Sequence, residues 1–314
     1  MPTTTARSSI HTPASQGSSG LLGFQGCPVL GVGLGLRREL LKPTLAATDL
    51  IHWLEVIPEN YMGREGLAQT HLQQAQERFP LISHGVNLSI AGPDPLDEVY
   101  LNDLQALFER IHPPWFSDHL CMTRMNGRYI NDLIPVPRTK ATVRYIADRI
   151  RQVQDRFQRP FLVENISYYL EYDQNTLPDA DFLAAVSEAA DCGILLDVNN
   201  IVVNAHNHGW NAHQYLDSLP LGRVVQLHVA GHQANSSIWV DTHGEAVCQA
   251  VWALVEEVLQ RCQPCGILLE RDSNFPEFEA LQAELTQLQA VWRQYVHNPA
   301  PTTATETTLE ASEA

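Results

Sequence analysis

Short apolar runs that end in a histidine or an acid recur along this chain and constrain its fold more than any other feature. In the run from Phe161 to Asn165, three apolar residues lead directly into Glu164. Runs of this length between polar residues are typical of buried strands. A carboxylate at the end of a buried strand is costly unless it is paired or bound to a metal ion. The same pattern ends five further runs, at His84, His119, Asp197, His228 and Glu270.

Segments with helical spacing of apolar residues separate these runs, and two further strand-like segments precede them. Those segments begin at Cys27 and Trp53. Strands that alternate with helices predict a parallel sheet, and eight such units predict a closed (β/α)8 TIM barrel of the α/β class. In that fold the functional site lies at the carboxyl ends of the strands, where the histidines and acids fall.

The length of 314 residues suits one such barrel with a tail at each end, since a TIM barrel takes about 250 residues. We expect a single barrel domain over residues 23–296. Residues 1–22 are rich in Ser, Thr and Gly, and residues 297–314 are rich in Thr and Glu. Neither composition forms a core, so we expect two disordered tails, of which the second is acidic.

The charge of the chain argues against two classes of partner. With 20 basic and 36 acidic side chains, the formal net charge is −16, which disfavours nucleic acid and anionic membranes. No apolar run approaches the roughly 20 residues of a membrane span, and the N-terminal segment lacks the apolar centre of a secretory signal. We therefore expect a cytoplasmic protein whose six cysteines are reduced, with the Cys262–Cys265 pair incidental.

Three segments are open to more than one interpretation. Gly31, Gly33 and Gly35 superficially suggest a phosphate-binding loop, but the pattern is incomplete, and close backbone packing in a barrel is the better interpretation. Residues 121–137 exceed the usual length of a strand–helix connection, which predicts a long functional or disordered loop. Residues 204–209 are polar and predict a further loop.

The histidines and acids at six strand ends and in one loop form a candidate metal centre. Nitrogen and oxygen donors suit zinc, iron or manganese rather than a soft-metal thiolate site. Their number exceeds what one ion needs, and Glu164 is placed to bridge two ions. We expect nearby polar residues to orient the ligands. The expected ligands are His84, His119, Glu164, Asp197, His228, Asp241, His243 and Glu270, and the expected neighbours are Asp118, Asn165, Asn199, Asn200 and His232.

The chain resembles the DUF692 (UPF0276) family, the multinuclear non-heme iron-dependent oxidative enzymes, which include methanobactin-biosynthesis-type peptide-modifying oxidases. The resemblance runs from about Gly31 to Asp272 and is carried by GVGLGLR, WLEVIPENYMG, SHGVNLSI, SDHL, FLVENISYYL, LLDVNN, LHVAGH, DTHG and LLERD. The order of the metal residues is also similar to that of xylose isomerase-like barrels. Those barrels typically carry a histidine where this chain has Asn199 and Asn200.

The resemblance implies an oxidase that modifies a ribosomally made precursor peptide at cysteine. It implies about two to three iron ions in mixed Fe(II)/Fe(III) states, O2 as co-substrate, and a small partner protein that recognises the leader of the peptide. By resemblance, one iron would be held by His84, His119 and Glu164, a central one by Glu164, Asp197, His228 and Glu270, and a third by Asp241, His243 and Asn199. The residues expected to take part in catalysis are Glu164, Asp118, Asn165 and His232.

Two other functions fit the same residues. A hydrolytic or isomerising enzyme with two or three metal ions would use the same donors, because zinc accepts them as readily as iron does. A metal-binding protein without turnover is the other alternative. The metal content and the oxygen uptake of protein purified without air would distinguish the three.

Overall fold

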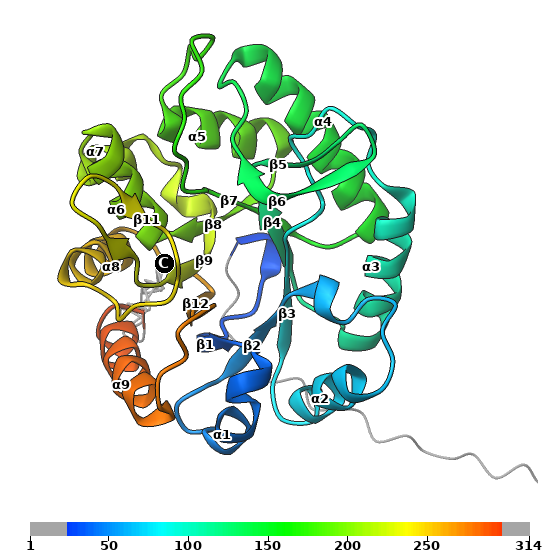
Figure 1. The fold of residues 1–314 in the computed structure, drawn as a ribbon, viewed down its shortest axis with the longest axis vertical. Coiled ribbons are helices and arrows are strands. Elements are labelled where there is room, and N and C mark those ends of the chain that lie inside the picture. Colours follow the sequence, from blue (N-terminus) through cyan, green and yellow to red (C-terminus); the bar gives the residue numbers. More distant parts are fainter. Residues whose placement is uncertain (1–23, 297–314) are drawn as a thin grey trace, which may run out of the picture.

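The computed structural model describes residues 24–296, so the expected tails lie outside the described residues. Eight parallel strands close into a barrel, and helices surround it (Figure 1). The fold predicted from the sequence, a (β/α)8 TIM barrel, is confirmed. The barrel strands are β1 Gly31–Gly35, β2 Trp53–Val56, β3 Leu81–Gly85, β4 Phe116–His119, β7 Phe161–Glu164, β8 Gly193–Asp197, β9 Val224–Val229 and β12 Gly266–Leu269.

The strands follow one another around the barrel in chain order, and β12 closes it by pairing with β1. Each connection carries at least one helix, and their apolar faces cover the outside of the sheet. The helices are α1 Leu41–Ala46, α2 Leu67–Gln76, α3 Glu98–Ile111, α4 Lys140–Phe157, α5 Asp179–Ala190, α6 Val198–His208, α7 Ala212–Ser218, α8 Gln249–Arg261 and α9 Phe278–Tyr295.

Side chains along each strand point alternately into and out of the barrel, and those that point inward form two layers in its interior. An apolar cluster fills the lower layer, and Trp53, Leu162 and Leu268 belong to it. Successive residues of a strand point to opposite faces, so the residue two positions later points inward again, one layer closer to the carboxyl end. Those residues are Glu55, Glu164 and Glu270. The same strands that build an apolar plug therefore present acids above it.

Close packing at the start of the barrel explains the glycines of β1. A Cβ atom on Gly33 would lie 2.4 Å from the ring of Trp53, and the indole nitrogen of Trp53 donates to the carbonyl of Gly31 at 2.9 Å. A side chain at position 33 would displace the Trp53 ring from the plug. The interpretation of these glycines as sites of close packing is confirmed.

Two segments predicted as loops instead contain regular secondary structure. Residues 121–137 contain an antiparallel hairpin of β5 Met122–Met125 and β6 Arg128–Ile134. Asn126 and Gly127 take positive φ angles at its turn, as Asn-Gly hairpins do. Residues 204–208 are the last part of α6, which ends where Gly209 adopts a left-handed conformation. Both loop predictions were wrong in these parts.

The structure also contains a short hairpin of β10 Gln233–Ala234 and β11 Trp239–Val240 between β9 and α8. Within residues 24–296, no helix is both long and apolar enough to cross a membrane.

Candidate metal centre

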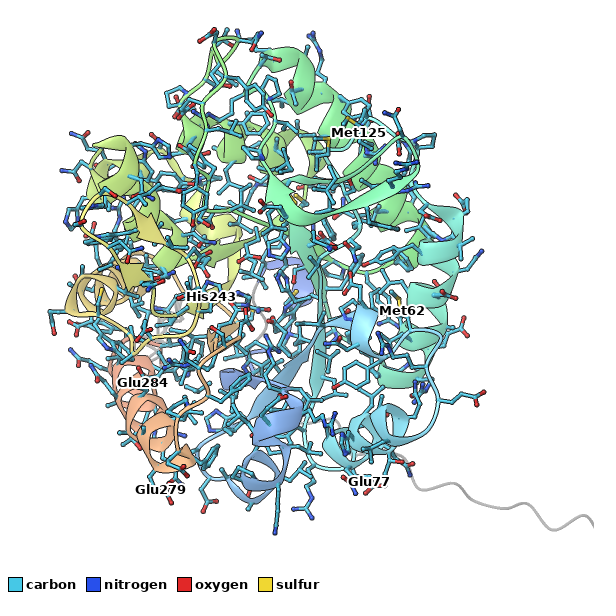
Figure 2. All side chains as sticks on the ribbon, in the orientation of Figure 1. Met62, Glu77, Met125, His243, Glu279 and Glu284 are labelled. Carbon is cyan, nitrogen blue, oxygen red and sulfur yellow. The ribbon has the colours of Figure 1, made fainter. Side chains whose placement is uncertain are left out.

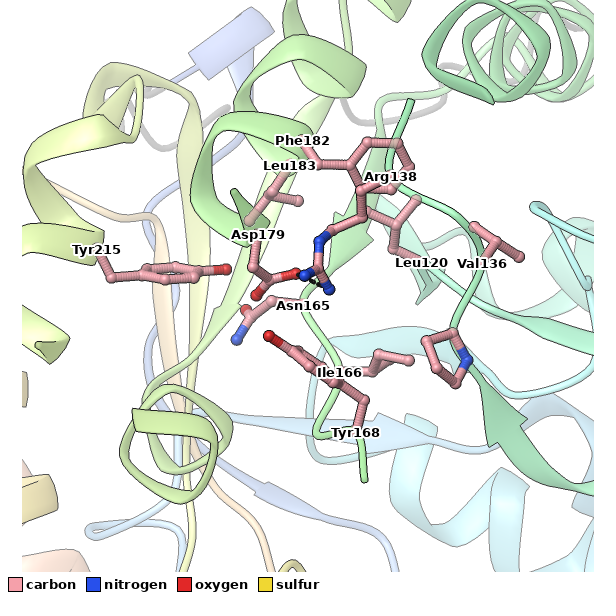
Figure 3. Close-up of a pocket in the computed structure, with 11 residues that line it drawn as sticks. Leu120, Val136, Arg138, Asn165, Ile166, Tyr168, Asp179, Phe182, Leu183 and Tyr215 are labelled. Carbon is pink, nitrogen blue, oxygen red and sulfur yellow. Dashed lines mark ion pairs between the residues drawn. The ribbon is translucent and has the colours of Figure 1, made fainter. Parts of the chain in front are cut away.

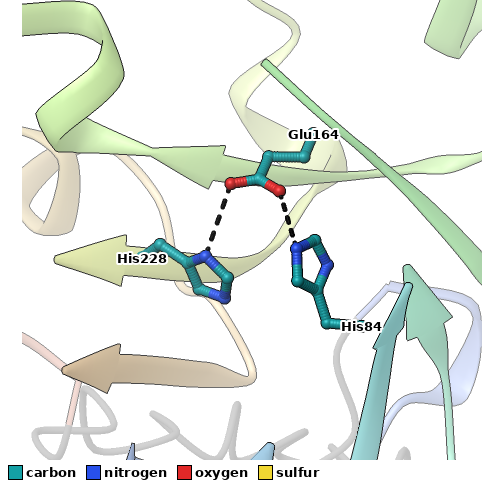
Figure 4. A group of neighbouring side chains, drawn as sticks. All are labelled: His84, Glu164 and His228. Carbon is teal, nitrogen blue, oxygen red and sulfur yellow. Dashed lines mark ion pairs between the residues drawn. The ribbon is translucent and has the colours of Figure 1, made fainter. Parts of the chain in front are cut away.

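The carboxyl ends of the strands bring Glu164 and three histidines together. Glu164 Oε2 lies 3.0 Å from His84 Nε2 and 3.1 Å from His119 Nε2. Its other oxygen, Oε1, lies 3.4 Å from His228 Nδ1. Figure 4 shows the Glu164 carboxylate between His84 and His228, with one oxygen turned to each ring. The register of the sheet sets this arrangement, because His119 on β4 pairs directly with Glu164 on β7.

A second group of donors surrounds His243, which lies in the loop between β11 and α8 (Figure 2). His243 Nε2 lies 2.7 Å from Asp241 Oδ1 and 3.7 Å from Asp197 Oδ2, and its Nδ1 lies 3.2 Å from Glu270 Oε2. Glu270 Oε2 is also 2.9 Å from His228 Nδ1. Glu270 and His228 therefore join the two groups into one continuous cluster.

Several donor atoms of the cluster are buried without a hydrogen bond, although they lie close to one another. These atoms are Glu164 Oε2, Asp197 Oδ2, His228 Nδ1 and His243 Nε2. Buried polar atoms rarely remain unsatisfied in folded proteins. Lone pairs of oxygen and nitrogen that converge on shared space are what a metal ion requires, and all the donors are of the type that zinc, iron and manganese accept. The residues therefore fit the metal ions that the sequence implies.

Three triads in the described part of the chain have donor atoms close enough to hold an ion. They are His84 with Glu164 and His228, Asp197 with His243 and Glu270, and Glu55 with His228 and Glu270. Of the eight histidines and acids predicted as ligands, all except His119 and Asp241 occur in these triads, and those two contact Glu164 and His243 directly. Asn199, which the resemblance adds as a ligand, occurs in none of them.

Glu55 is the one member of these triads that was not predicted as a ligand from the sequence. It is buried on β2, and its Oε2 lies 3.1 Å from His228 Nε2 and accepts a hydrogen bond from the side chain of Gln226. Trp115 in turn donates to Gln226 Oε1 at 2.8 Å. A carboxylate that accepts from one ring nitrogen of a histidine leaves the other for a metal ion. The signal in the sequence was an acid inside an apolar strand, two residues after Trp53.

Hydrogen bonds fix the rings of two histidines from behind. His119 Nδ1 lies 3.0 Å from the carbonyl of Gly85, which can only accept, so Nε2 faces Glu164 without a proton in the neutral ring. His84 Nδ1 lies 2.9 Å from Ser117 Oγ. Both rings therefore present Nε2 to Glu164, and each is held by the neighbouring strand, His84 by β4 and His119 by β3.

The burial of so many charged groups shifts their pKa values in opposite directions. Burial lowers the pKa of His84, but Glu164 and Glu55 outweigh it and raise the pKa to about 9. Burial raises the pKa of Glu164, but His119 and His84 outweigh it and hold the pKa below its usual range. Asp197 differs, because burial keeps its pKa well above the usual range despite His243. A cation beside Asp197 would offset that cost.

Asp197 also organises the backbone of the site. Its Oδ1 accepts from the backbone amide of Asn200 and so caps the N-terminus of α6, which leaves Oδ2 facing His243. Asn165 bonds both backbone groups of Asp197 through its side-chain amide, at 2.9 Å each. Asn200 donates to the carbonyl of Asn165 at 3.0 Å. The two asparagines thus fix the ends of β7 and β8 relative to each other.

The remaining predicted residues lie at the edge of the cluster. Asn199 Nδ2 donates to Asp241 Oδ1 at 2.9 Å, and Asn199 Oδ1 lies 2.7 Å from His232 Nδ1. Asp118 accepts from the backbone amides of His119 and Leu88 at 2.8 and 3.1 Å, and burial raises its pKa to about 8. One oxygen of Asp118 is therefore bonded to the backbone at the end of β4, and the other to the backbone of the loop that follows β3.

A separate polar group lies beside the end of β7, around Arg138 (Figure 3). The guanidinium lies 2.7 Å from Glu171 Oε2, 3.9 Å from Asp179 Oδ1 and 5.0 Å from the centre of the Tyr168 ring. Burial raises the pKa of Asp179 to about 6, although Arg138 opposes the shift. Arg138 thus ties the start of α5 to the segment after β7.

The fold and the site together define a TIM-barrel enzyme with histidine and carboxylate clusters that could bind metal ions. A family model described as the RiPP precursor modification enzyme MbnB/TglH/ChrH matches residues 31–293. RiPPs are ribosomally made, post-translationally modified peptides. The chain belongs to this family, whose members are also named UPF0276 proteins.

Relatives from several bacteria match over most of their length. A UPF0276 protein of Acaryochloris marina is 43% identical over 259 residues, which cover 82% of this chain and 94% of the relative. A UPF0276 protein of Acinetobacter baylyi is 41% identical over 271 residues, which cover 86% and 94%. The family resemblance expected from the sequence is confirmed.

Solved structures show the same barrel at low sequence identity. A D-psicose 3-epimerase from Clostridium cellulolyticum has a TM-score of 0.57 and 10% identity, with 85% of this chain and 99% of the epimerase covered. Endonuclease IV from Thermus thermophilus has a TM-score of 0.50 and 15% identity, with 84% and 98% covered. At these identities the likeness shows the fold alone, which is the xylose isomerase-like barrel.

Proposed function

We propose that this protein is a multinuclear iron enzyme that uses O2 to modify a ribosomally made precursor peptide at cysteine. The observation that carries the proposal is the continuous cluster of buried donors in which Glu164, His228 and Glu270 each contact more than one neighbour. Membership of the family of RiPP precursor modification enzymes supports a peptide as the substrate. We further propose a small partner protein that recognises the leader, and a cytoplasmic location.

The proposed ligand sets are those that the family resemblance implies. One ion would be held by His84, His119 and Glu164, and a central one by Glu164, Asp197, His228 and Glu270. A third would be held by Asp241 and His243 with Asn199. Iron ions bound there would supply Lewis acidity and one-electron redox chemistry to a thiol and O2.

The other residues of the site would keep the ligands in their binding states. Glu55 would hold the proton on His228 Nε2, so that Nδ1 stays free for an ion. The carbonyl of Gly85 would hold the proton on Nδ1 of His119, so that Nε2 stays free for an ion. Asn165 would keep Asp197 in place through its backbone. We propose His232 and Asp118 as further participants, His232 through Asn199 and Asp118 through the loop that it holds.

The test is co-expression of this protein with a short peptide encoded beside it, with and without a neighbouring partner gene. We expect at least two metal ions per chain, mainly iron, in protein prepared without air. We also expect a peptide mass change that requires both iron and O2. Zinc with peptide hydrolysis or sugar isomerisation would favour the hydrolytic or isomerising alternative. Metal without any turnover would favour a metal-binding protein.

A further inference from the structure

A cavity of about 400 Å³ opens beside the barrel mouth, next to the cluster but outside it. It lies between the segment that follows β1, the segment that follows β2, and the first turns of α2. Both segments leave the carboxyl ends of their strands, so the cavity lies on the same face of the barrel as the candidate metal centre (Figure 1). Its volume is in the range of sites that bind small molecules or single side chains.

The charge of this cavity runs against that of the chain. Arg37, Arg38, Arg64 and His71 line it, whereas Glu39 is its one acid. In a protein of net charge −16, such a gathering of three arginines is a local exception. Within residues 24–296, the guanidinium groups of Arg38 and Arg64 make no ion pair or hydrogen bond, and both residues are exposed. They are free to bind an anion that enters.

Arg37 connects the cavity to the candidate metal centre. It is buried, its Nε donates to Asp272 Oδ1 at 3.0 Å, and its Nη2 lies 3.7 Å from Glu270 Oε1. Glu270 is a member of two of the triads that could hold an ion. Arg37 therefore separates the inner end of the cavity from the cluster. A group bound in the cavity would lie next to the barrel mouth on the side of Glu270.

The walls of the cavity include apolar side chains and a hydroxyl group, which suit an organic ligand better than an inorganic ion. Leu41 and Tyr61 are buried there, and Leu67 and Ala68 line the same space. The hydroxyl of Tyr61 makes no hydrogen bond within the described residues, so it can donate to a ligand. An apolar wall beside unpaired guanidinium groups suits an aliphatic group that carries a carboxylate.

We propose that this cavity binds the C-terminal carboxylate of the peptide substrate and so fixes the peptide across the barrel mouth. The identity of the ligand as a peptide rests on the proposed function. The binding chemistry rests on Arg38, Arg64 and Tyr61 alone. These residues would position the substrate and would take no part in the chemistry.

The probe for this site is the dipeptide acetyl-Gly-Leu with a free carboxylate, compared with its C-terminal carboxamide. Binding to the full chain with its native metal content is measured by calorimetry or ligand-observed NMR. We expect the carboxylate to bind at least about tenfold more tightly than the amide, because the amide lacks the charge-assisted hydrogen bonds. The double variant Arg38→Gln/Arg64→Gln should weaken carboxylate binding at least about tenfold.

The matched control is Arg144→Gln, which removes an exposed arginine from α4, away from the cavity, and should leave binding unchanged. Metal content should be the same in all variants, because Arg38 and Arg64 contact no residue of the cluster. Equal binding of carboxylate and amide would overturn the proposal. So would unchanged affinity in the double variant.

Two further measurements separate other sources of binding. After treatment with a chelator, the dipeptide should still bind. Loss of binding on metal removal, with no effect of the double variant, would mean that a metal ion holds the carboxylate, and would overturn the proposal. Inorganic phosphate that competes as well as the dipeptide would show a general anion site and overturn the assignment to a peptide. None of these results depends on turnover, so the proposed function stands or fails separately.

Discussion

Glu164 is the residue on which the two sides of the cluster depend. Its Oε2 contacts His84 and His119, while its Oε1 contacts His228. Glu164→Gln keeps the size of the side chain but replaces one carboxylate oxygen by an NH2 group, which can neither accept a hydrogen bond nor bind a metal ion. We expect this variant to lose metal at both neighbouring positions, whereas His243→Ala should empty mainly the site around Asp241. Elemental analysis of protein prepared without air measures both.

That comparison holds only if both variants fold, so far-UV circular dichroism must match the wild type. Full metal content together with full turnover in Glu164→Gln would show that Glu164 does not bridge two ions.

Glu55 offers a second prediction at the scale of single residues, because it contacts His228 Nε2 rather than the unpaired Nδ1. In Glu55→Gln the proton on Nε2 loses its carboxylate acceptor. We expect metal affinity to fall about 10- to 100-fold, as is typical when such a partner is removed. Glu279→Gln, an exposed site on α9, is the control and should bind metal normally (Figure 2). Titration against a competing chelator gives the affinities, and equal values for both variants would contradict the role of Glu55.

The sequence located most of the cluster because six of the expected ligands end an apolar run, which placed them at strand ends without knowledge of the fold, whereas Asp241 and His243 lie in a loop. Glu55 could not be assigned in this way, since it lies inside its run. Glu55 points to the same face of the sheet as Trp53, because the two residues are two positions apart on β2. Only the closed barrel shows that this face is the interior. The bonds of Asp118 to the amide of Leu88 and of Asn165 to the backbone of Asp197 likewise join segments that are far apart in the chain, which spacing along the sequence does not reveal.

Among the elements, the barrel strands and most helices followed from periodicity, while the hairpin of β5 and β6 did not. Its turn carries the Asn126–Gly127 pair, a recognised hairpin signal, but its strands have no apolar alternation, because much of their surface is exposed. Helix α6 was missed for another reason. Asp197 is both the last residue of β8 and the N-cap of α6, so no polar linker separates the strand from the helix in the sequence.

Strand β1 can be tested through its close contact with β2. Gly33→Ala would place a methyl group 2.4 Å from the Trp53 ring, which is held by its bond to Gly31. We expect the free energy of unfolding to fall by about 1 to 3 kcal/mol, the usual cost of overpacking. Gly222→Ala is the matched control, since nothing lies within 4 Å of the added atom. Urea unfolding measures both, and a stable Gly33→Ala protein would show that Trp53 can move.

The start of α5 should respond to pH through Asp179. Burial raises its pKa to about 6 in the folded protein, above the value of an unfolded aspartate. The unfolded chain therefore releases this proton first, so the contribution of Asp179 to stability falls as pH rises from about 4 to 6. Asp179→Asn removes that loss. Relative to the wild type, it should gain about 2 to 3 kcal/mol between pH 4 and pH 7 in urea unfolding. A constant difference across this range would contradict the assignment.

At the scale of the whole molecule, the barrel combines an apolar lower layer with an upper layer of buried acids and histidines. The lower layer stabilises the closed sheet, whereas the upper layer costs free energy unless its charges are compensated. The histidines offset part of that cost, since Glu164 and Glu55 raise the pKa of His84 to about 9. Asp197 remains uncompensated, because its pKa stays well above the usual range. Metal ions would complete the balance.

Removal of metal should therefore destabilise the entire barrel. A ligand that binds only the folded state stabilises it by about 2.7 kcal/mol when present at 100 times its Kd. We expect chelation to lower Tm by several degrees, and Fe(II) added without air to restore it. Glu164→Gln should respond less, because it starts with fewer bound ions. If chelation leaves the wild-type Tm unchanged while metal analysis confirms removal, the protonated histidines alone balance the acids, and metal binding at the mouth is not coupled to the stability of the fold.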